Sequence, residues 1–176
     1  PHLSALKLQN LDVNPKLILW LVNFMVNRTQ PVRFLTALSC SRTTSVGSPQ
    51  GTVLSPILFT LYTNDCQGTD FTPLIKYSDD TALQDLSNSH SVYQDEVSKL
   101  CSWCKDNFLD LNVKKTKELL IDFRKNTTAA PDLYIEGMKV ERVHEYKYLG
   151  TMIDDKLFFN ANTQVVYKKC QSRLYC

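Results

Sequence analysis

Three stretches in the first half of the chain carry apolar residues at spacings that predict helices. The most apolar stretch runs from Lys16 to about Asn27 and follows Asn14-Pro15, a pair that suits a helix N-terminus. Leu3 to Leu8 has the pattern of the end of a helix. The run from Ser55 to about Cys66 predicts a buried helix with Ser55 as its N-cap and Pro56 as its first helical residue.

A longer helix is predicted from about Ser89 to Phe108. Its apolar residues recur at three- and four-residue steps along one face, at Tyr93, Val97, Leu100, Cys104 and Phe108. We expect Tyr93 and Trp103 to pack in the core rather than to stack on bases, because large aromatic side chains on such a face are most often buried.

Runs of β-branched and aromatic residues predict strands around these helices. They lie at Pro31 to Leu38, Thr43 to Val46, Leu119 to Phe123, Leu133 to Ile135, Lys139 to Val143 and Lys147 to Ile153. A turn at Glu136-Gly137 joins the two strands that flank it. The mixture of helices and strands predicts an α+β fold.

Two adjacent carboxylates, Asp79 and Asp80, stand between two apolar-leaning runs. Phe71 to Ile75 precedes Tyr77-Ser78-Asp79-Asp80 and Thr81 to Leu86 follows it, so the pattern predicts a β-hairpin with the acids at its tip. Neighbouring like charges are costly unless a cation neutralises them, which favours a Mg²⁺ site. A solvated Asp-Asp turn without metal is the alternative, because Asp side chains favour turns.

A loop punctuated by Gly and Pro precedes the helix predicted from Ser55. Gly47 and Gly51 allow a backbone to approach a ligand closely, and Gln50 between them offers a donor and an acceptor. No Gly-Lys-Ser/Thr follows, so the loop is not a P-loop, and it lacks the dinucleotide fingerprint. A plain loop before a capped helix is the alternative.

The composition indicates one globular unit over residues 1–176. The chain is 43% hydrophobic and 22% charged, which is enough to bury a core. The longest apolar stretch, Leu17 to Phe24 with Met25 and Val26, is too short for a membrane span, and Pro1-His2-Leu3-Ser4 does not begin a signal peptide. Cys101-Ser102-Trp103-Cys104 is an isolated C-x-x-C, which favours free thiols in a reducing compartment over zinc.

The net charge of +2 is weak support for nucleic-acid binding, so the distribution of charge matters more. Basic residues concentrate in two stretches: Lys114, Lys115, Lys117, Arg124 and Lys125 in one, and Lys168, Lys169 and Arg173 in the other. Phosphate contacts would explain both stretches, and solvated surfaces without a ligand are the alternative.

The loop and the acidic hairpin, in this order and at this spacing, resemble reverse transcriptases, and within them the enzymes of LINE-type non-LTR retrotransposons. Gly47 to Pro56, continuing through Leu58-Phe59, is similar to the family's nucleotide and template loop, and Tyr77 to Asp80 to its Tyr-x-Asp-Asp metal motif. Leu111 to Lys117 resembles the family's Leu-Asn-x-x-Lys-Thr segment, and Tyr146 to Gly150 resembles the strand that grips the primer end.

The resemblance implies a polymerase palm, an antiparallel sheet with packed helices, plus part of the fingers. Residues 160–176 would begin a thumb that is largely absent. In this family a first metal-binding Asp lies on a strand shortly before the segment that Pro1-His2-Leu3 resembles. We therefore expect an internal fragment or a degenerate genomic copy, which lacks its primary metal ligand and is inactive by itself.

The resemblance also implies an RNA-directed DNA polymerase as the parent enzyme. A DNA primer 3′-hydroxyl would attack the α-phosphorus of a dNTP, directed by an RNA template, at a two-metal Mg²⁺ site. The resemblance implies metal binding and catalysis for Asp79 and Asp80, and protonation of pyrophosphate for Lys115. Residues implied to contact the template–nucleotide pair are Gly47, Pro49, Gln50 and Gly51. Those implied to contact the primer end are Tyr77, Tyr148, Leu149 and Gly150. The parent would act inside the cell, in cytoplasm or nucleus, away from membranes.

Two rival interpretations stay open. One is a non-catalytic, nucleic-acid-binding remnant of a retrotransposon. The other is an RNA-dependent RNA polymerase or a maturase-like relative, which shares an Asp-Asp hairpin, although the Gln50 loop and the segment from Leu111 to Lys117 argue against it.

Overall fold

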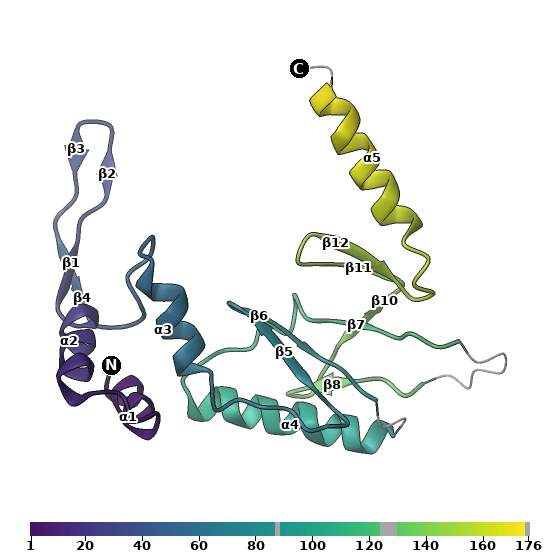
Figure 1. The fold of residues 1–176 in the computed structure, drawn as a ribbon, viewed down its shortest axis with the longest axis horizontal. Coiled ribbons are helices and arrows are strands. Elements are labelled where there is room, and N and C mark those ends of the chain that lie inside the picture. Colours follow the sequence, from purple (N-terminus) through teal and green to yellow (C-terminus); the bar gives the residue numbers. More distant parts are fainter. Residues whose placement is uncertain (87–88, 124–129, 175–176) are drawn as a thin grey trace. The chain divides into compact units, whose positions relative to one another are not determined.

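The computed structural model describes residues 1–86, 89–123 and 130–174. The chain divides into two compact units, Pro1–Leu86 and Ser87–Cys176, and both combine helices with short strand pairs (Figure 1). The predicted α+β class is confirmed at this level.

The first unit contains three helices and three antiparallel ladders. Its elements are α1 (His2–Asn10), α2 (Pro15–Met25), β1 (Arg28–Gln30), β2 (Arg33–Phe34), β3 (Ala37–Leu38), β4 (Arg42–Thr44), α3 (Leu54–Tyr62), β5 (Leu74–Tyr77) and β6 (Asp80–Leu83). Strand β1 pairs with β4, β2 with β3 and β5 with β6.

The described part of the second unit contains two helices, two antiparallel ladders and one parallel ladder. Its elements are α4 (His90–Asp106), β7 (Lys117–Leu119), β8 (Tyr134–Ile135), β9 (Met138–Lys139), β10 (Glu141–Val143), β11 (Glu145–Tyr148), β12 (Thr151–Asp154) and α5 (Asn160–Leu174). Strand β8 pairs with β9 and β11 with β12, whereas β10 runs parallel to β7.

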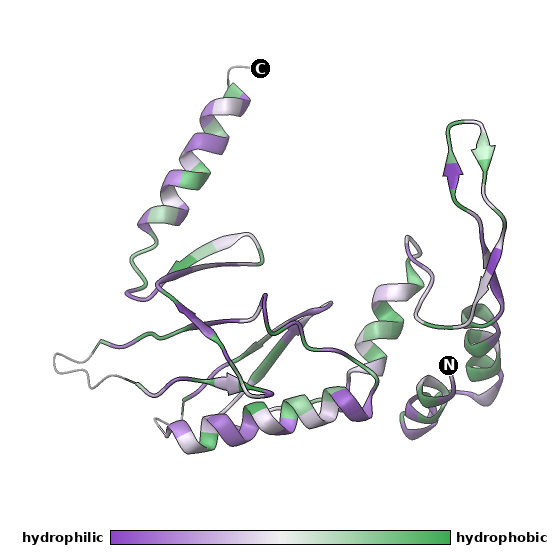
Figure 2. Ribbon diagram, turned by 180° about the vertical axis from the view of Figure 1, so that it is seen from behind, coloured by the Kyte–Doolittle hydropathy of each residue, from purple (hydrophilic) through white to green (hydrophobic). Residues whose placement is uncertain are grey.

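The core of the first unit forms where α1, α2 and α3 meet. Leu8, Ile18, Leu21, Met25 and Leu58 are its buried members. Figure 2 shows α2 as a strongly apolar helix, and it supplies Ile18, Leu21 and Met25 to this core. The predicted start of α2 is confirmed, because the side chain of Asn14 accepts a hydrogen bond from the backbone N–H of Lys16 at 2.9 Å.

The core of the second unit lies on one face of α4. Val97 and Cys104 of this helix are buried, as are Val113, Leu133, Ile135 and Val140 beyond it. The predicted helix and most of its apolar face are therefore confirmed. Phe108 is the exception: the helix ends at Asp106, and Phe108 has a φ of 53° and is 87% exposed.

Several predicted strands divide differently in the structure. Pro31 to Leu38 and Lys147 to Ile153, each predicted as one strand, both contain a chain reversal and form hairpins. The strand predicted over Leu119 to Phe123 lies earlier in the chain, since β7 spans Lys117–Leu119. The Glu136-Gly137 turn is confirmed. Both residues have a positive φ, which a two-residue hairpin turn needs in order to match the twist of its strands.

The predicted antiparallel sheet is not continuous in the described part of the chain. Each described ladder has two strands, and the β7–β10 ladder is parallel. The parallel pairing follows from the chain path, because the connection from β7 to β10 is long enough to return in the same direction and holds the β8–β9 hairpin.

None of the helices in the described residues is both long and apolar enough to span a lipid bilayer.

Candidate functional site

Asp79 and Asp80 lie at the tip of the β5–β6 hairpin, as the sequence predicted. Tyr77 pairs with Asp80, so Ser78 and Asp79 form a two-residue turn. Ser78 has a φ of 55°, the left-handed conformation that primed hairpin turns use. Both carboxylates are exposed, and neither forms a hydrogen bond or ion pair with another described residue. Their oxygens are free to bind a ligand.

Lys76 ties this hairpin to the end of α3. Its ammonium group donates hydrogen bonds to the carbonyl oxygens of Thr63 at 2.5 Å and Cys66 at 2.7 Å. The last carbonyls of a helix have no partner within the helix, and a cation there also opposes the negative end of the helix dipole. Lys7 supports the same helix end by donating to the carbonyl oxygen of Tyr62 at 2.8 Å.

The segment before the hairpin is tightly packed. Thr72 is fully buried, and its hydroxyl lies 2.6 Å from that of Thr69. Gly68 stands beside it, where an added Cβ would lie 2.1 Å from the carbonyl oxygen of Thr72. Burial raises the pKa of the nearby Cys66 thiol, although the charge of Lys76 opposes the shift. The base of the acidic hairpin is thus fixed by contacts that the sequence pattern did not reveal.

The Gly47 loop is anchored at both ends. The guanidinium of Arg28 donates to the carbonyl oxygens of Val46 and Gly47, each at 2.8 Å. At the other end, the hydroxyls of Thr52 and Ser55 both donate to the carbonyl oxygen of Pro49. These contacts hold the backbone of the loop in place and leave the side chain of its central residue, Gln50, exposed.

Gln50 is the exposed residue at the centre of this loop. Its side chain has no hydrogen bond to another described residue. Gly47 and Gly51 have φ values of 70° and 76°, and an added Cβ at either would meet nothing within 4 Å. The glycines therefore serve the backbone conformation and leave space next to Gln50.

The predicted N-cap at Ser55 is wrong. Helix α3 begins at Leu54, and Val53 at the N-cap position forms no side-chain cap. Ser55 lies instead inside the first turn of α3, and its hydroxyl donates a hydrogen bond to the carbonyl oxygen of Pro49. The sequence therefore identified Ser55 as a hydrogen-bonding residue at the start of α3, but it did not identify the Pro49 carbonyl as the partner.

In the second unit, Lys115 projects from a turn built by its neighbours. The side-chain oxygen of Asn112 accepts from the backbone N–H of Lys115 at 3.2 Å, and its carbonyl oxygen accepts from the hydroxyl of Thr116 at 3.0 Å. Val113 is buried below the turn. Lys114 and Lys115 are exposed, and neither ammonium group has a partner among the residues described. The Leu-Asn-x-x-Lys-Thr pattern thus has a local structural explanation.

Lys117, in contrast, is not available as a free cation. It forms an ion pair with Glu141 across the β7–β10 ladder, and Arg142 pairs with Glu118 at 2.8 Å in the next register position. Arg124 and Lys125, which completed the basic stretch in the sequence, lie outside the described residues.

Tyr148, Leu149 and Gly150 form the end and turn of the β11–β12 hairpin. Tyr148 pairs with Thr151, and Leu149 and Gly150 have φ values of 47° and 89°. The hydroxyl oxygen of Tyr148 is buried and has no hydrogen-bond partner in the part of the chain described. The predicted primer-contacting segment is therefore a hairpin turn and not the middle of a strand.

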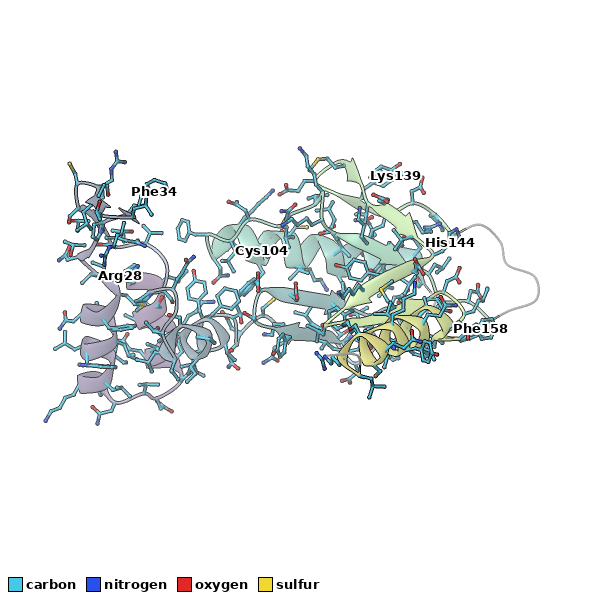
Figure 3. The ribbon with its side chains drawn as sticks, turned by 90° about the horizontal axis from the view of Figure 1, so that it is seen from above. Arg28, Phe34, Cys104, Lys139, His144 and Phe158 are labelled. Carbon is cyan, nitrogen blue, oxygen red and sulfur yellow. The ribbon has the colours of Figure 1, made fainter. Side chains whose placement is uncertain are left out.

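The chain contains a second Asp-Asp pair, and its environment differs. The carboxylate of Asp154 accepts hydrogen bonds from the backbone N–H groups of Phe158, Phe159 and Lys156, which lower its pKa. Asp155 lies 2.8 Å from the imidazole Nδ1 of His144, and Figure 3 labels His144 and Phe158 in this region. Asp154-Asp155 is a structural turn, whereas the Asp79 and Asp80 carboxylates have no such partners in the described ranges of the chain.

The Asp79-Asp80 pair fits a divalent metal only in part. Carboxylate oxygens suit hard cations, and both groups are exposed. The described residues contain no group of three or more His, Cys, Asp and Glu side chains that could hold a metal ion. Two carboxylates that could serve as ligands are therefore present, and a metal bound there would need further ligands to complete its shell.

Several residues that organise the site carried no sequence signal. Arg28, Lys76 and Thr52 each act on a backbone carbonyl that lies elsewhere in the chain or across a loop. Arg28 and Lys76 belong to no periodic pattern or motif, and the motif that contains Thr52 does not indicate its bond to Pro49, so only the folded chain reveals these partners.

The comparisons with known proteins agree with the sequence motifs. Residues 2–153 match the protein family described as reverse transcriptase (RNA-dependent DNA polymerase). The chain is 27% identical over 166 residues to the probable RNA-directed DNA polymerase from transposon BS of Drosophila melanogaster, covering 88% of this chain and 18% of that protein. It is 26% identical over 163 residues to that of transposon X-element from the same species, again covering 88% and 18%.

A third relative is the RNA-directed DNA polymerase from mobile element jockey of Drosophila melanogaster, which is 27% identical over 177 residues, covering 91% of this chain and 19% of that protein. The chain thus spans less than one fifth of the length of these relatives. No solved structure matches it significantly. Together with the four motifs, these similarities show that the chain belongs to the reverse transcriptase family and is a domain fragment of the LINE-type, non-LTR retrotransposon kind.

Proposed function

We propose that this chain is the palm and part of the fingers of an RNA-directed DNA polymerase, with residues 160–176 at the start of the thumb. The observation that carries the proposal is the β5–β6 hairpin, which presents Asp79 and Asp80 to solvent on a turn that Lys76 fixes to α3. Exposed, unpaired carboxylates on an anchored turn are suited to binding a cation.

Asp79 and Asp80 would hold Mg²⁺ as two of its ligands, and a further carboxylate from another part of the polymerase would complete the shell. When bound, the metal would neutralise charge on the transferring phosphoryl group and polarise its oxygens. Ser78, a small residue in the turn, would let the primer duplex lie close to the carboxylates, and Tyr77 would support the primer terminus.

Gln50 would contact the template–nucleotide pair. Its exposure, the open space at Gly47 and Gly51, and the fixed carbonyl of Pro49 support this role, because a preorganised loop loses little freedom on binding. An RNA template, a DNA primer and dNTPs would be the partners of the complete polymerase.

Lys115 would protonate the departing pyrophosphate, and Tyr148, Leu149 and Gly150 would contact the primer. Lys115 is supported by its exposure on a turn that Asn112 and Thr116 shape. For the primer contact, the support is the tight turn at Leu149-Gly150, which brings backbone to the surface. The isolated chain, with two metal ligands, would not extend a primer.

Primer extension by a longer polymerase built around this segment tests the proposal. Asp79→Asn should abolish Mg²⁺-dependent extension, whereas Asp70→Asn, an exposed carboxylate of the same unit, should leave it unchanged. The second candidate, a non-catalytic nucleic-acid-binding remnant, is favoured by the absence of a three-ligand cluster among the described residues. It predicts no extension in the parent and only salt-dependent binding.

A further inference from the structure

The strands between α2 and the Gly47 loop form one long hairpin that does not belong to the proposed catalytic site. The β1–β4 ladder makes its base and the β2–β3 ladder its outer part, and Val32 and Ser39 bond to each other between the two. Leu35, with a φ of 52°, turns the chain at the tip. Figure 1 shows this hairpin extending away from α2, and Figure 3 labels Phe34 in its outer part and Arg28 near its base.

The outer part of the hairpin is apolar and exposed. Phe34 is 75% exposed and Leu35 80% exposed, and Val32 and Leu38 beside them are also open to solvent. Contiguous apolar side chains of this kind on a surface mark an interaction site. An aromatic ring in this position offers a flat face for stacking.

The charged side chains in the sequence interval that contains the hairpin are all positive. No Asp or Glu occurs between Asp12 and Asp65, and the basic residues of that interval are Lys16, Arg28, Arg33 and Arg42. Arg28 is occupied by the carbonyls of Met25, Val46 and Gly47. Such a stretch complements a polyanion.

Two of these arginines keep free donors on the hairpin itself. Arg33 uses one guanidinium N–H for the carbonyl oxygen of Leu35, at 3.3 Å. Arg42 pairs with Gln30 through the backbone ladder, and its guanidinium has no partner among the described residues. Their remaining N–H groups are available to phosphate oxygens.

We propose that this hairpin, through Arg33, Arg42 and Phe34, is a contact surface for single-stranded nucleic acid. Proteins that bind single strands combine cationic side chains along the backbone with aromatic rings on which bases stack. Hydroxyl groups also line the hairpin and can donate to phosphates: Thr29, Thr36, Ser39, Ser41, Thr43 and Thr44. So many hydroxyls disfavour a membrane surface as the partner, because they would have to be desolvated there.

The inference rests on the proposed function, which brings a single-stranded template to this polymerase, and it adds a contact outside the catalytic residues. The contact does not involve Asp79, Gln50 or Lys115.

Binding of the 176-residue chain to short fluorescein-labelled oligouridylate and oligothymidylate, followed by anisotropy without Mg²⁺ or dNTP, tests the inference. Phe34→Ala should weaken binding about tenfold, and Phe34→Trp should retain it, with the new indole quenched by the bound bases. Arg42→Ala should weaken binding and lower the slope of log affinity against log salt by about 0.7, as expected for one lost phosphate contact. Arg42→Lys should retain most of the salt dependence.

Lys16→Ala is the matched control, because Lys16 is also exposed, lies in the same acid-free interval and is outside the hairpin. It should change the affinity less than Arg42→Ala does. Absence of single-strand binding, equal effects of Lys16→Ala and Arg42→Ala, or binding only to phosphatidylserine vesicles would each overturn the inference. None of these results depends on primer extension, so this proposal and the catalytic one can fail separately.

Discussion

The guanidinium of Arg28 lies 2.8 Å from the carbonyl oxygen of Gly47, across 18 intervening positions of the chain. The same side chain binds the carbonyl oxygens of Val46 and Met25. One residue therefore connects the end of α2, the first strand of the long hairpin and the loop that carries Gln50. A buried or half-buried charge with three such partners fixes backbone more firmly than a neutral hydrogen bond does.

Replacing Arg28 should loosen the Gly47 loop. Arg28→Ala removes three hydrogen bonds from a charged donor, so we expect a loss of about 1 to 3 kcal/mol in the local stability of the loop. Hydrogen exchange of the backbone amides from Gly47 to Thr52 measures this loss. Arg33→Ala is the control, because among the described residues the guanidinium of Arg33 donates only to the nearby Leu35 carbonyl. Equal exchange in both variants would show that Arg28 does not anchor the loop.

Gly68→Ala should destabilise the first unit. The added methyl group would lie 2.1 Å from the carbonyl oxygen of Thr72 and 2.7 Å from the backbone nitrogen of Leu74, so the backbone must move. We expect a loss of about 2 kcal/mol or more in the free energy of unfolding. Urea unfolding followed by tryptophan fluorescence measures it in two single-Trp backgrounds: Trp103→Phe keeps Trp20 of the first unit, and Trp20→Phe keeps Trp103 of the second.

Gly137→Ala provides the comparison for this prediction. Gly137 has a φ of 77° but open space around it, so an alanine there meets only the backbone penalty of about 1 kcal/mol. If Gly68→Ala proved no more damaging than Gly137→Ala, the packing around Thr72 would be looser than the structure indicates.

The turn before α5 should weaken in acid. Hydrogen bonds from the backbone N–H groups of Phe158, Phe159 and Lys156 lower the pKa of Asp154. A lowered folded-state pKa means that the stabilisation is complete above the ordinary Asp value of about 4 and is lost as the pH falls through the lower folded value. The NMR shifts of the Phe158 and Phe159 amides should therefore titrate together below about pH 4. A midpoint at or above the ordinary value would contradict the assignment.

Thiol reactivity should separate the cysteines by burial. Cys40 and Cys170 are exposed, whereas Cys66 and Cys104 are buried, and burial raises the pKa of Cys66 so that it stays a thiol at neutral pH. Iodoacetamide at pH 7.5 should label the exposed pair quickly and the buried pair only after denaturation, as peptide mass spectrometry would record. Rapid labelling of Cys66 in the native chain would contradict its burial.

The sequence predicted those features that local chemistry determines. The Asn14 cap, the apolar face of α4, the Glu136-Gly137 turn and the acidic hairpin all depend on residues a few positions apart. The motifs also led to the correct family. In these places local propensity and tertiary structure agree.

The remaining errors arise where distant partners decide the structure. Ser55 has the chemistry of an N-cap, but the carbonyl of Pro49 takes its hydroxyl. Lys117 looked free because Glu141 lies far from it in sequence. The single predicted strand from Lys147 to Ile153 missed its turn, since Leu149 rarely takes the positive φ that it has here.

The central claim is that the Asp79-Asp80 turn carries metal ligands of a polymerase palm. Line broadening of backbone NMR signals by substoichiometric Mn²⁺ tests this claim on the chain itself, because a paramagnetic ion affects only nearby nuclei. Asp154-Asp155 is an internal control, since backbone amides and His144 already occupy its carboxylates. We predict broadening centred on Ser78 to Thr81, reversed by excess Mg²⁺ and abolished by Asp79→Asn with Asp80→Asn. Broadening at Asp154-Asp155 with none at Ser78 to Thr81 would contradict the account.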